Sequence, residues 1–92
     1  MTDALGQLVI ERKRLKFRSW HRGTREMDLL LGRFADQRLN AFDAEAVGVY
    51  AALLEESDPD IYNWVTGREE CPSSVLRPLI ADLAEFHSSI SS

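Results

Sequence analysis

Residues that build covalent or metal-linked sites are scarce in this 92-residue chain. The single cysteine, Cys71, excludes an internal disulfide, and the lack of a disulfide framework in so small a protein suits a reducing compartment. The only two histidines, His21 and His87, are far apart in the sequence, and no cluster of cysteine, histidine or carboxylate has metal-ligand spacing. We therefore expect no metal site and interpret Cys71 as an ordinary, partly buried thiol.

Long apolar runs and glycine-rich loops are also missing. No run approaches the ~20 apolar residues that cross a bilayer, and the N-terminal residues resemble neither a secretory signal nor an arginine-rich transit peptide. We expect a cytoplasmic protein without membrane insertion. None of the five glycines belongs to a phosphate-binding loop, and Ser19 near His21 has no third member of a hydrolase triad. The chain is therefore not expected to be an enzyme.

Charge is present but unevenly distributed. Residues 1–40 contain nine Lys and Arg against five Asp and Glu, whereas residues 41–92 contain two against ten. Seven of the eleven basic residues lie between Arg12 and Arg25, together with Phe17 and Trp20. A basic segment with aromatics is one footprint of nucleic-acid binding, but the pI of about 5.1 and the acidic second half argue against it. The alternative is a solvated helix face whose aromatics cover a helical bundle, and we expect no nucleic-acid partner.

Hydrophobic spacing predicts helices throughout. The first helix should begin after Asp3 as N-cap and break before Gly23, and the second should run from about Thr24 to Leu39. The apolar residues expected to be buried in these helices are Leu5, Leu8, Val9 and Leu15, then Met27, Leu30, Leu31, Phe34 and Ala35.

Three further helices are predicted in the second half. Asp43 should cap the third, and Asp58 the fourth, with Pro59 at its first position and Gly67 after its end. The fifth has Pro78 in its first turn and ends in a frayed tail at about 88–92. The residues expected to be buried are Val47, Tyr50, Ala51, Leu54, Ile61, Trp64, Val65, Leu76, Leu79, Ile80, Leu83 and Phe86. The prediction is all-α: a small single-domain bundle of five helices over residues 1–92.

The segment 17–34 contains the candidate site. Arg22 and Glu26 are four residues apart, and Gly23 between them allows close approach of another backbone. An arginine fork and a carboxylate beside a glycine can form a charge-complementary docking point. The alternative is a capping box, with Gly23 as N-cap, Glu26 as its third-position partner and Arg22 solvated. Trp20 is a candidate contact residue beside this cluster, and both alternatives stay open on spacing alone.

The residues RGTREMDLLLGRF, followed by LLEESDPDIYNWVTG, resemble the SdhE-type flavinylation factors, a family that includes the mitochondrial succinate dehydrogenase assembly factor 2. The resemblance covers roughly residues 11–67, through an Arg-Gly-x-x-Glu motif and a downstream Leu-Leu-Glu, Asp-Pro-Asp and Trp arrangement. The residues carrying it are Arg22, Gly23, Glu26, Leu53, Leu54, Glu55, Asp58, Pro59, Asp60 and Trp64.

This resemblance implies a five-helix assembly factor of chaperone type. It would bind the flavoprotein subunit of succinate dehydrogenase, and in bacteria also that of fumarate reductase, and promote covalent attachment of FAD to a histidine of that subunit. The FAD would belong to the partner, with no cofactor stably bound here. The contact surface would comprise Arg22, Gly23 and Glu26, supported by Arg18 and Asp28, with His21 where many members have arginine.

The resemblance and the short tail also imply a bacterial protein, and we expect a monomer. Two other classes remain: a generic helical adaptor or antitoxin-like regulator, and a nucleic-acid-binding regulator. A pull-down with the flavoprotein subunit would distinguish a generic adaptor from an assembly factor. A nucleic-acid-binding regulator should lose affinity for nucleic acid steeply as the salt concentration rises.

Overall fold

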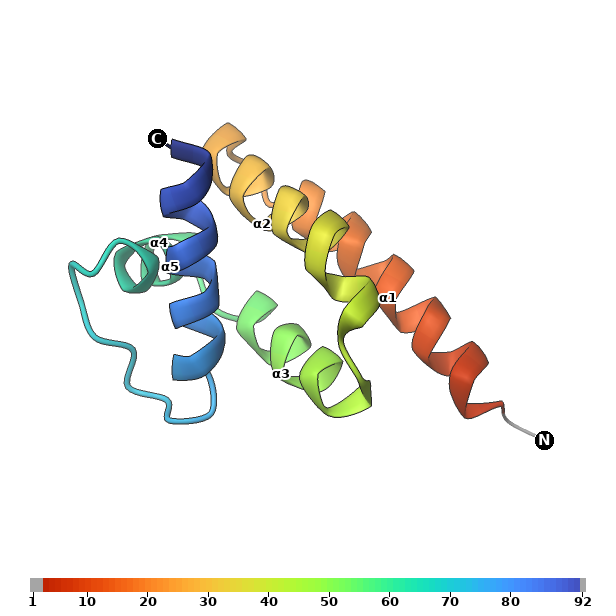
Figure 1. The fold of residues 1–92 in the computed structure, drawn as a ribbon. Coiled ribbons are helices and arrows are strands. Elements are labelled where there is room, and N and C mark those ends of the chain that lie inside the picture. Colours follow the sequence, from red (N-terminus) through yellow and green to blue (C-terminus); the bar gives the residue numbers. More distant parts are fainter. Residues whose placement is uncertain (1–2, 92) are drawn as a thin grey trace. The chain divides into compact units, whose positions relative to one another are not determined.

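The structure is a computed structural model that describes residues 3–91, in which helices joined by loops are present and no strand occurs (Figure 1). The all-α prediction with five α-helices is confirmed for these residues. The helices are α1 (Ala4–Trp20), α2 (Arg25–Arg38), α3 (Ala44–Leu54), α4 (Asp58–Val65) and α5 (Arg77–Ser91), with a short 3-10 helix, η1 (Leu39–Ala41), after α2.

The chain divides into two compact units, and the division falls within α3, between Gly48 and Val49. The first unit contains α1, α2 and η1, and the second contains α4 and α5. Each unit is described by itself below. That residues 1–92 form a single domain stays a prediction.

In the first unit, α1 and α2 form an antiparallel pair joined by a short loop (Figure 1). The helices approach closely where the Trp20 indole covers Gly32: a Cβ added at Gly32 would lie 2.2 Å from the nearest indole carbon. The indole Nε1 of Trp20 donates a hydrogen bond of 3.2 Å to the Asp36 carboxylate on α2. The predicted face of α2 is confirmed, since Met27, Leu30, Leu31, Phe34 and Ala35 are all buried.

The start of α1 is predicted correctly, but the residues predicted to form its buried face are only partly confirmed. Asp3 is the N-cap, and its carboxylate accepts the Leu5 N–H at 3.1 Å. Leu15 is buried as expected, whereas Leu5 and Val9 are 66% and 41% exposed, contrary to the prediction. The buried side chains of α1 are Leu15 and Ser19, which lie in its C-terminal half. Hydrophobic spacing identifies a possible face but does not show how far along a helix its packing partner extends.

In the second unit, α4 packs against α5. The residues predicted to be buried in these helices are confirmed, as is Leu76 directly before α5: Ile61, Trp64, Val65, Leu76, Leu79, Ile80, Leu83 and Phe86. In α3, Val47, Tyr50 and Leu54 are buried, and Ala51 is half-buried.

The starts of α3 and α4 test the capping predictions. Asp43 caps α3, since its carboxylate accepts the Ala46 N–H at 2.8 Å. The predicted cap of α4 is wrong by one residue, because the extended Ser57 is the N-cap and its hydroxyl accepts the Asp60 N–H at 3.2 Å. Serine and aspartate are both good caps, so composition alone does not separate adjacent candidates.

The ends of the last two helices give mixed outcomes. Gly67 follows α4 with φ +78°, the left-handed conformation expected of a residue that ends a helix. Helix α5 continues through Ser91, although the sequence predicts fraying from about residue 88, and residue 92 lies outside the described residues. Cys71, between these helices, is buried and is not paired in a disulfide.

Candidate functional site

The loop between α1 and α2 has a specific backbone conformation. Helix α1 ends at His21, whose N–H donates to the Arg18 carbonyl at 3.2 Å. Gly23 follows with φ +112°, a value that residues with a side chain rarely adopt. Thr24 is extended and becomes the N-cap of α2, with its hydroxyl 3.4 Å from the Met27 N–H. The glycine is thus required by the turn that connects the two helices.

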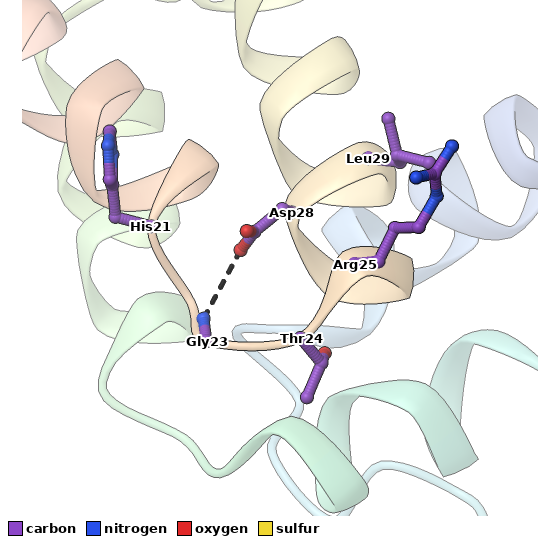
Figure 2. Close-up of a pocket in the computed structure, with 6 residues that line it drawn as sticks. All are labelled: His21, Gly23, Thr24, Arg25, Asp28 and Leu29. Carbon is purple, nitrogen blue, oxygen red and sulfur yellow. Dashed lines mark hydrogen bonds between the residues drawn. The ribbon is translucent and has the colours of Figure 1, made fainter.

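The Asp28 carboxylate holds this loop from the first turns of α2. Its Oδ1 accepts the Arg22 N–H at 2.6 Å and the Gly23 N–H at 3.3 Å. Figure 2 shows the Asp28 side chain directed at the loop backbone, with its bond to Gly23 dashed. A carboxylate that accepts two backbone N–H groups is a strong acceptor, because the charge strengthens both bonds. Asp28 therefore acts on the loop conformation within this chain.

The capping-box alternative is wrong. Thr24 rather than Gly23 is the N-cap, so Glu26 is the second residue of α2 and is not the reciprocal partner of Gly23. Glu26 is exposed, and its side chain makes no hydrogen bond or ion pair with any residue that the structure describes. Residues Arg22–Thr24 are not helical, so helical four-residue spacing does not relate Arg22 to Glu26. The relative placement of these two residues follows instead from the conformation of the loop.

The His21 ring is fixed by two contacts with Phe17, one turn earlier on α1. The rings stack with centroids 4.0 Å apart and planes 19° apart. The His21 Nδ1 lies 2.6 Å from the Phe17 carbonyl oxygen. A carbonyl oxygen only accepts hydrogen bonds, so Nδ1 is the donor in this contact. Phe17 is 65% exposed, and the two rings form an ordered aromatic pair at the end of α1.

Two open hollows surround the loop and share His21. The larger, with a volume of about 670 Å³, is lined by His21, Gly23, Thr24, Arg25, Asp28 and Leu29 (Figure 2). The smaller, of about 200 Å³, is lined by Phe17, Arg18, His21 and Arg22.

Five of the seven predicted contact residues line these hollows: Arg18, His21, Arg22, Gly23 and Asp28. Glu26 is exposed in the first turn of α2 but lines neither hollow. Trp20 also lines neither, and its ring is engaged in packing α1 onto α2 at Gly32. That these residues bind a partner stays a prediction.

Sequence reasoning missed Phe17, which it assigned to covering the bundle. The ring is largely exposed and lies beside the predicted contact residues. A signal was available in the spacing, since Phe17 and His21 are four residues apart on one helix and such pairs are neighbours on its surface.

The structure offers two findings on metals and membranes. Within residues 3–91, no group of three or more histidine, cysteine or carboxylate side chains could hold a metal ion. No helix in that same part of the chain combines the length and the apolar character needed to cross a bilayer.

Comparison with known proteins identifies the family. The family described as "Flavinator of succinate dehydrogenase" matches residues 13–87, a range that includes the loop, both hollows and most of α5. No solved structure matches the chain.

Individual relatives agree with this match. The chain is 36% identical over 78 residues to the FAD assembly factor SdhE of Acetobacter pasteurianus, covering 85% of this chain and 72% of that protein. It is 41% identical over 72 residues to the mitochondrial succinate dehydrogenase assembly factor 2 of Dictyostelium discoideum, covering 78% of this chain and 51% of the relative. The mitochondrial succinate dehydrogenase assembly factor 2 of Schizosaccharomyces japonicus is 39% identical over 79 residues, covering 85% of this chain and 55% of the relative.

The chain thus spans only about half the length of these two mitochondrial relatives. The relatives are named as assembly factors and not as enzymes. With the family match extending over most of its residues and a bacterial relative of similar extent, the chain belongs to the family of flavinators of succinate dehydrogenase.

Proposed function

We propose that the chain binds the flavoprotein subunit of succinate dehydrogenase and promotes covalent attachment of FAD to a histidine of that subunit. The flavoprotein of fumarate reductase is the second proposed client. The observation that carries the proposal is the family match over residues 13–87, which spans the whole candidate site. The chain would act as a monomer in the bacterial cytoplasm, and the FAD would belong to the client.

The α1–α2 loop is the proposed docking point. Its backbone is held by Asp28 through two hydrogen bonds, so little conformational entropy remains to be lost when a partner binds. Gly23 lies in open space, since nothing is found within 4 Å of a Cβ added there, and Arg22 precedes it while Glu26 lies three residues later in the first turn of α2. A partner backbone can therefore approach the loop closely at Gly23, and the exposed Glu26 carboxylate of α2 can accept hydrogen bonds from it.

The proposed contribution to flavinylation is positional and involves no covalent step on this chain. Binding one conformer of the immature flavoprotein increases the population in which its histidine and FAD are aligned for reaction. A tenfold shift toward that conformer requires differential binding of about 1.4 kcal/mol. An interface built around one arginine and one carboxylate can supply that amount.

Covalent flavin content tests the function. We would measure in-gel flavin fluorescence of the denatured flavoprotein subunit in cells with and without the gene. Fluorescence should fall without the gene and be restored by the wild-type chain, but not by Arg22→Ala or Glu26→Ala. Undiminished fluorescence in the deletion strain would contradict the proposed function.

Glu45 provides a matched control for Glu26. Both are exposed carboxylates at the second position of a helix, Glu26 in α2 and Glu45 in α3. Replacing either by alanine removes the same favourable interaction with the helix dipole, so the two variants should lose similar, small amounts of stability. Only Glu26→Ala should lower flavinylation. An equal effect of both variants would contradict a contact role for Glu26.

A further inference from the structure

We propose that the exposed face at the end of α1, formed by Phe17, Arg18, His21 and Arg22, is a second part of the docking surface. Its occupant is an extended segment of the flavoprotein client that carries an acidic side chain next to an apolar one. This inference rests on the proposed function and adds to it the chemistry of the segment that is bound and an anchor residue, Phe17.

The first argument is the ordering of an exposed aromatic ring. Phe17 is 65% exposed, yet its ring stacks on His21 at 4.0 Å. His21 is in turn held by the 2.6 Å contact of its Nδ1 with the Phe17 carbonyl. A ring that stacks on a neighbour in the free chain has less rotamer freedom to lose on binding, and large aromatics dominate the energetics of interfaces. Leu5 is equally exposed on the same helix, at 66%, but has no such stacking partner.

The second argument is charge complementarity. Residues 12–25 contain seven Lys and Arg and no Asp or Glu, and the hollow beside Phe17 is lined by Arg18 and Arg22. Arg25 lines the neighbouring hollow and is exposed. With seven basic and no acidic side chains, this segment attracts a partner that carries carboxylates and repels a basic one, and the exposed Arg25 can donate charge-assisted hydrogen bonds to it.

The third argument is the size and continuity of the two hollows. The hollow at Phe17 has a volume of about 200 Å³, below the roughly 300–1,000 Å³ typical of small-molecule sites. It suits a single side chain. His21 lines both hollows, so an extended segment can fill one and continue into the other, toward Gly23 and Arg25.

The test is the affinity of the full chain for the purified flavoprotein subunit, measured by calorimetry. We expect Phe17→Ala to weaken binding at least tenfold and Leu5→Ala, the matched exposed residue, to leave it unchanged. Because both side chains are exposed, neither variant should change the unfolding midpoint appreciably. Wild-type affinity for Phe17→Ala would overturn this inference alone, and failure of the wild-type chain to bind would overturn both it and the proposed function.

Arg25→Glu tests the acidic character of the bound segment. Arg25 is the first residue of α2, where a carboxylate interacts favourably with the helix dipole, so the variant should be at least as stable as wild type. Its affinity for the subunit should nevertheless fall several-fold. Unchanged or improved affinity would contradict an acidic partner. If Phe17→Ala and Arg25→Glu instead weakened binding to a single-stranded oligonucleotide while the subunit bound normally, the surface would be a nucleic-acid site and the proposal wrong.

Discussion

At the scale of single residues, Gly23 and Asp28 have complementary roles in the α1–α2 loop. Gly23 adopts φ +112°, and Asp28 accepts the N–H groups of Gly23 and its neighbour Arg22. The family resemblance implies that Gly23 belongs to the contact surface and that Asp28 supports it, which stays a prediction, but it does not reveal the bonds that Asp28 makes within this chain. Its actual bonds cross from α2 back to a non-helical turn, and their geometry depends on a backbone conformation that spacing rules for regular helices do not describe.

Substitution of Gly23 should destabilise the chain through its backbone. Nothing lies within 4 Å of an added Cβ, so the cost of Gly23→Ala arises from the positive φ and should be about 1–3 kcal/mol of unfolding free energy. Gly48→Ala is the control, because that site is also open but helical, and the change should stabilise by about 0.5–1 kcal/mol. Urea denaturation measures both, and equal effects would contradict the conformational argument.

Removal of the Asp28 carboxylate should loosen the loop. Asp28→Ala leaves two backbone N–H groups without their acceptor and should cost about 1–3 kcal/mol of unfolding free energy. Asp28→Asn retains one acceptor oxygen and should lose less. The amide resonances of Arg22 and Gly23 should move most in a ¹H–¹⁵N spectrum. Unchanged resonances in Asp28→Ala would show that the carboxylate does not hold the loop.

At the scale of the helices, the buried face is predicted correctly where both helices of a packed pair show a hydrophobic pattern. The stripe of α2 and the buried residues of α5 follow from spacing alone, since each repeats with helical period over several turns. The face of α1 does not, because Leu5 and Val9 continue a plausible stripe into turns where they remain exposed. Nor does spacing reveal the closest contact of α1 with α2, since Gly32 carries no side chain to be counted.

Gly32→Ala should disturb this contact. The new Cβ would lie 2.2 Å from the Trp20 indole, so the ring must shift and its bond to Asp36 must lengthen or break. We expect a loss of about 1–3 kcal/mol, typical of overpacking, with a change in tryptophan fluorescence. Because Gly48→Ala introduces the same methyl group into open space, it is again the control. An unchanged emission spectrum and unfolding midpoint for Gly32→Ala would contradict the close packing.

At the scale of the whole chain, the uneven distribution of charge is the dominant property. The net charge of −4 conceals a basic excess in residues 1–40 and an acidic excess in residues 41–92. Such a distribution orients the chain in the field of a charged partner before contact is made. It influences the rate of encounter and the orientation of docking but does not determine the fold.

The rate of association with the proposed flavoprotein client should therefore depend on salt. Raising the ionic strength from about 0.01 M to 1 M shortens the screening length from about 30 Å to 3 Å, and the association rate constant should fall at least tenfold. The dissociation rate constant should change much less. Stopped-flow mixing at several salt concentrations measures both. An association rate independent of salt would contradict electrostatic steering.

The Asp28 bonds also have a consequence for how such a surface can diversify. They engage the backbone N–H groups at positions 22 and 23, so these two bonds do not require a particular side chain at position 22. In the proposed docking surface, the side chain at position 22 can therefore be changed without removing either bond. Redesign for a different flavoprotein should begin there, with Asp28 and Gly23 kept constant.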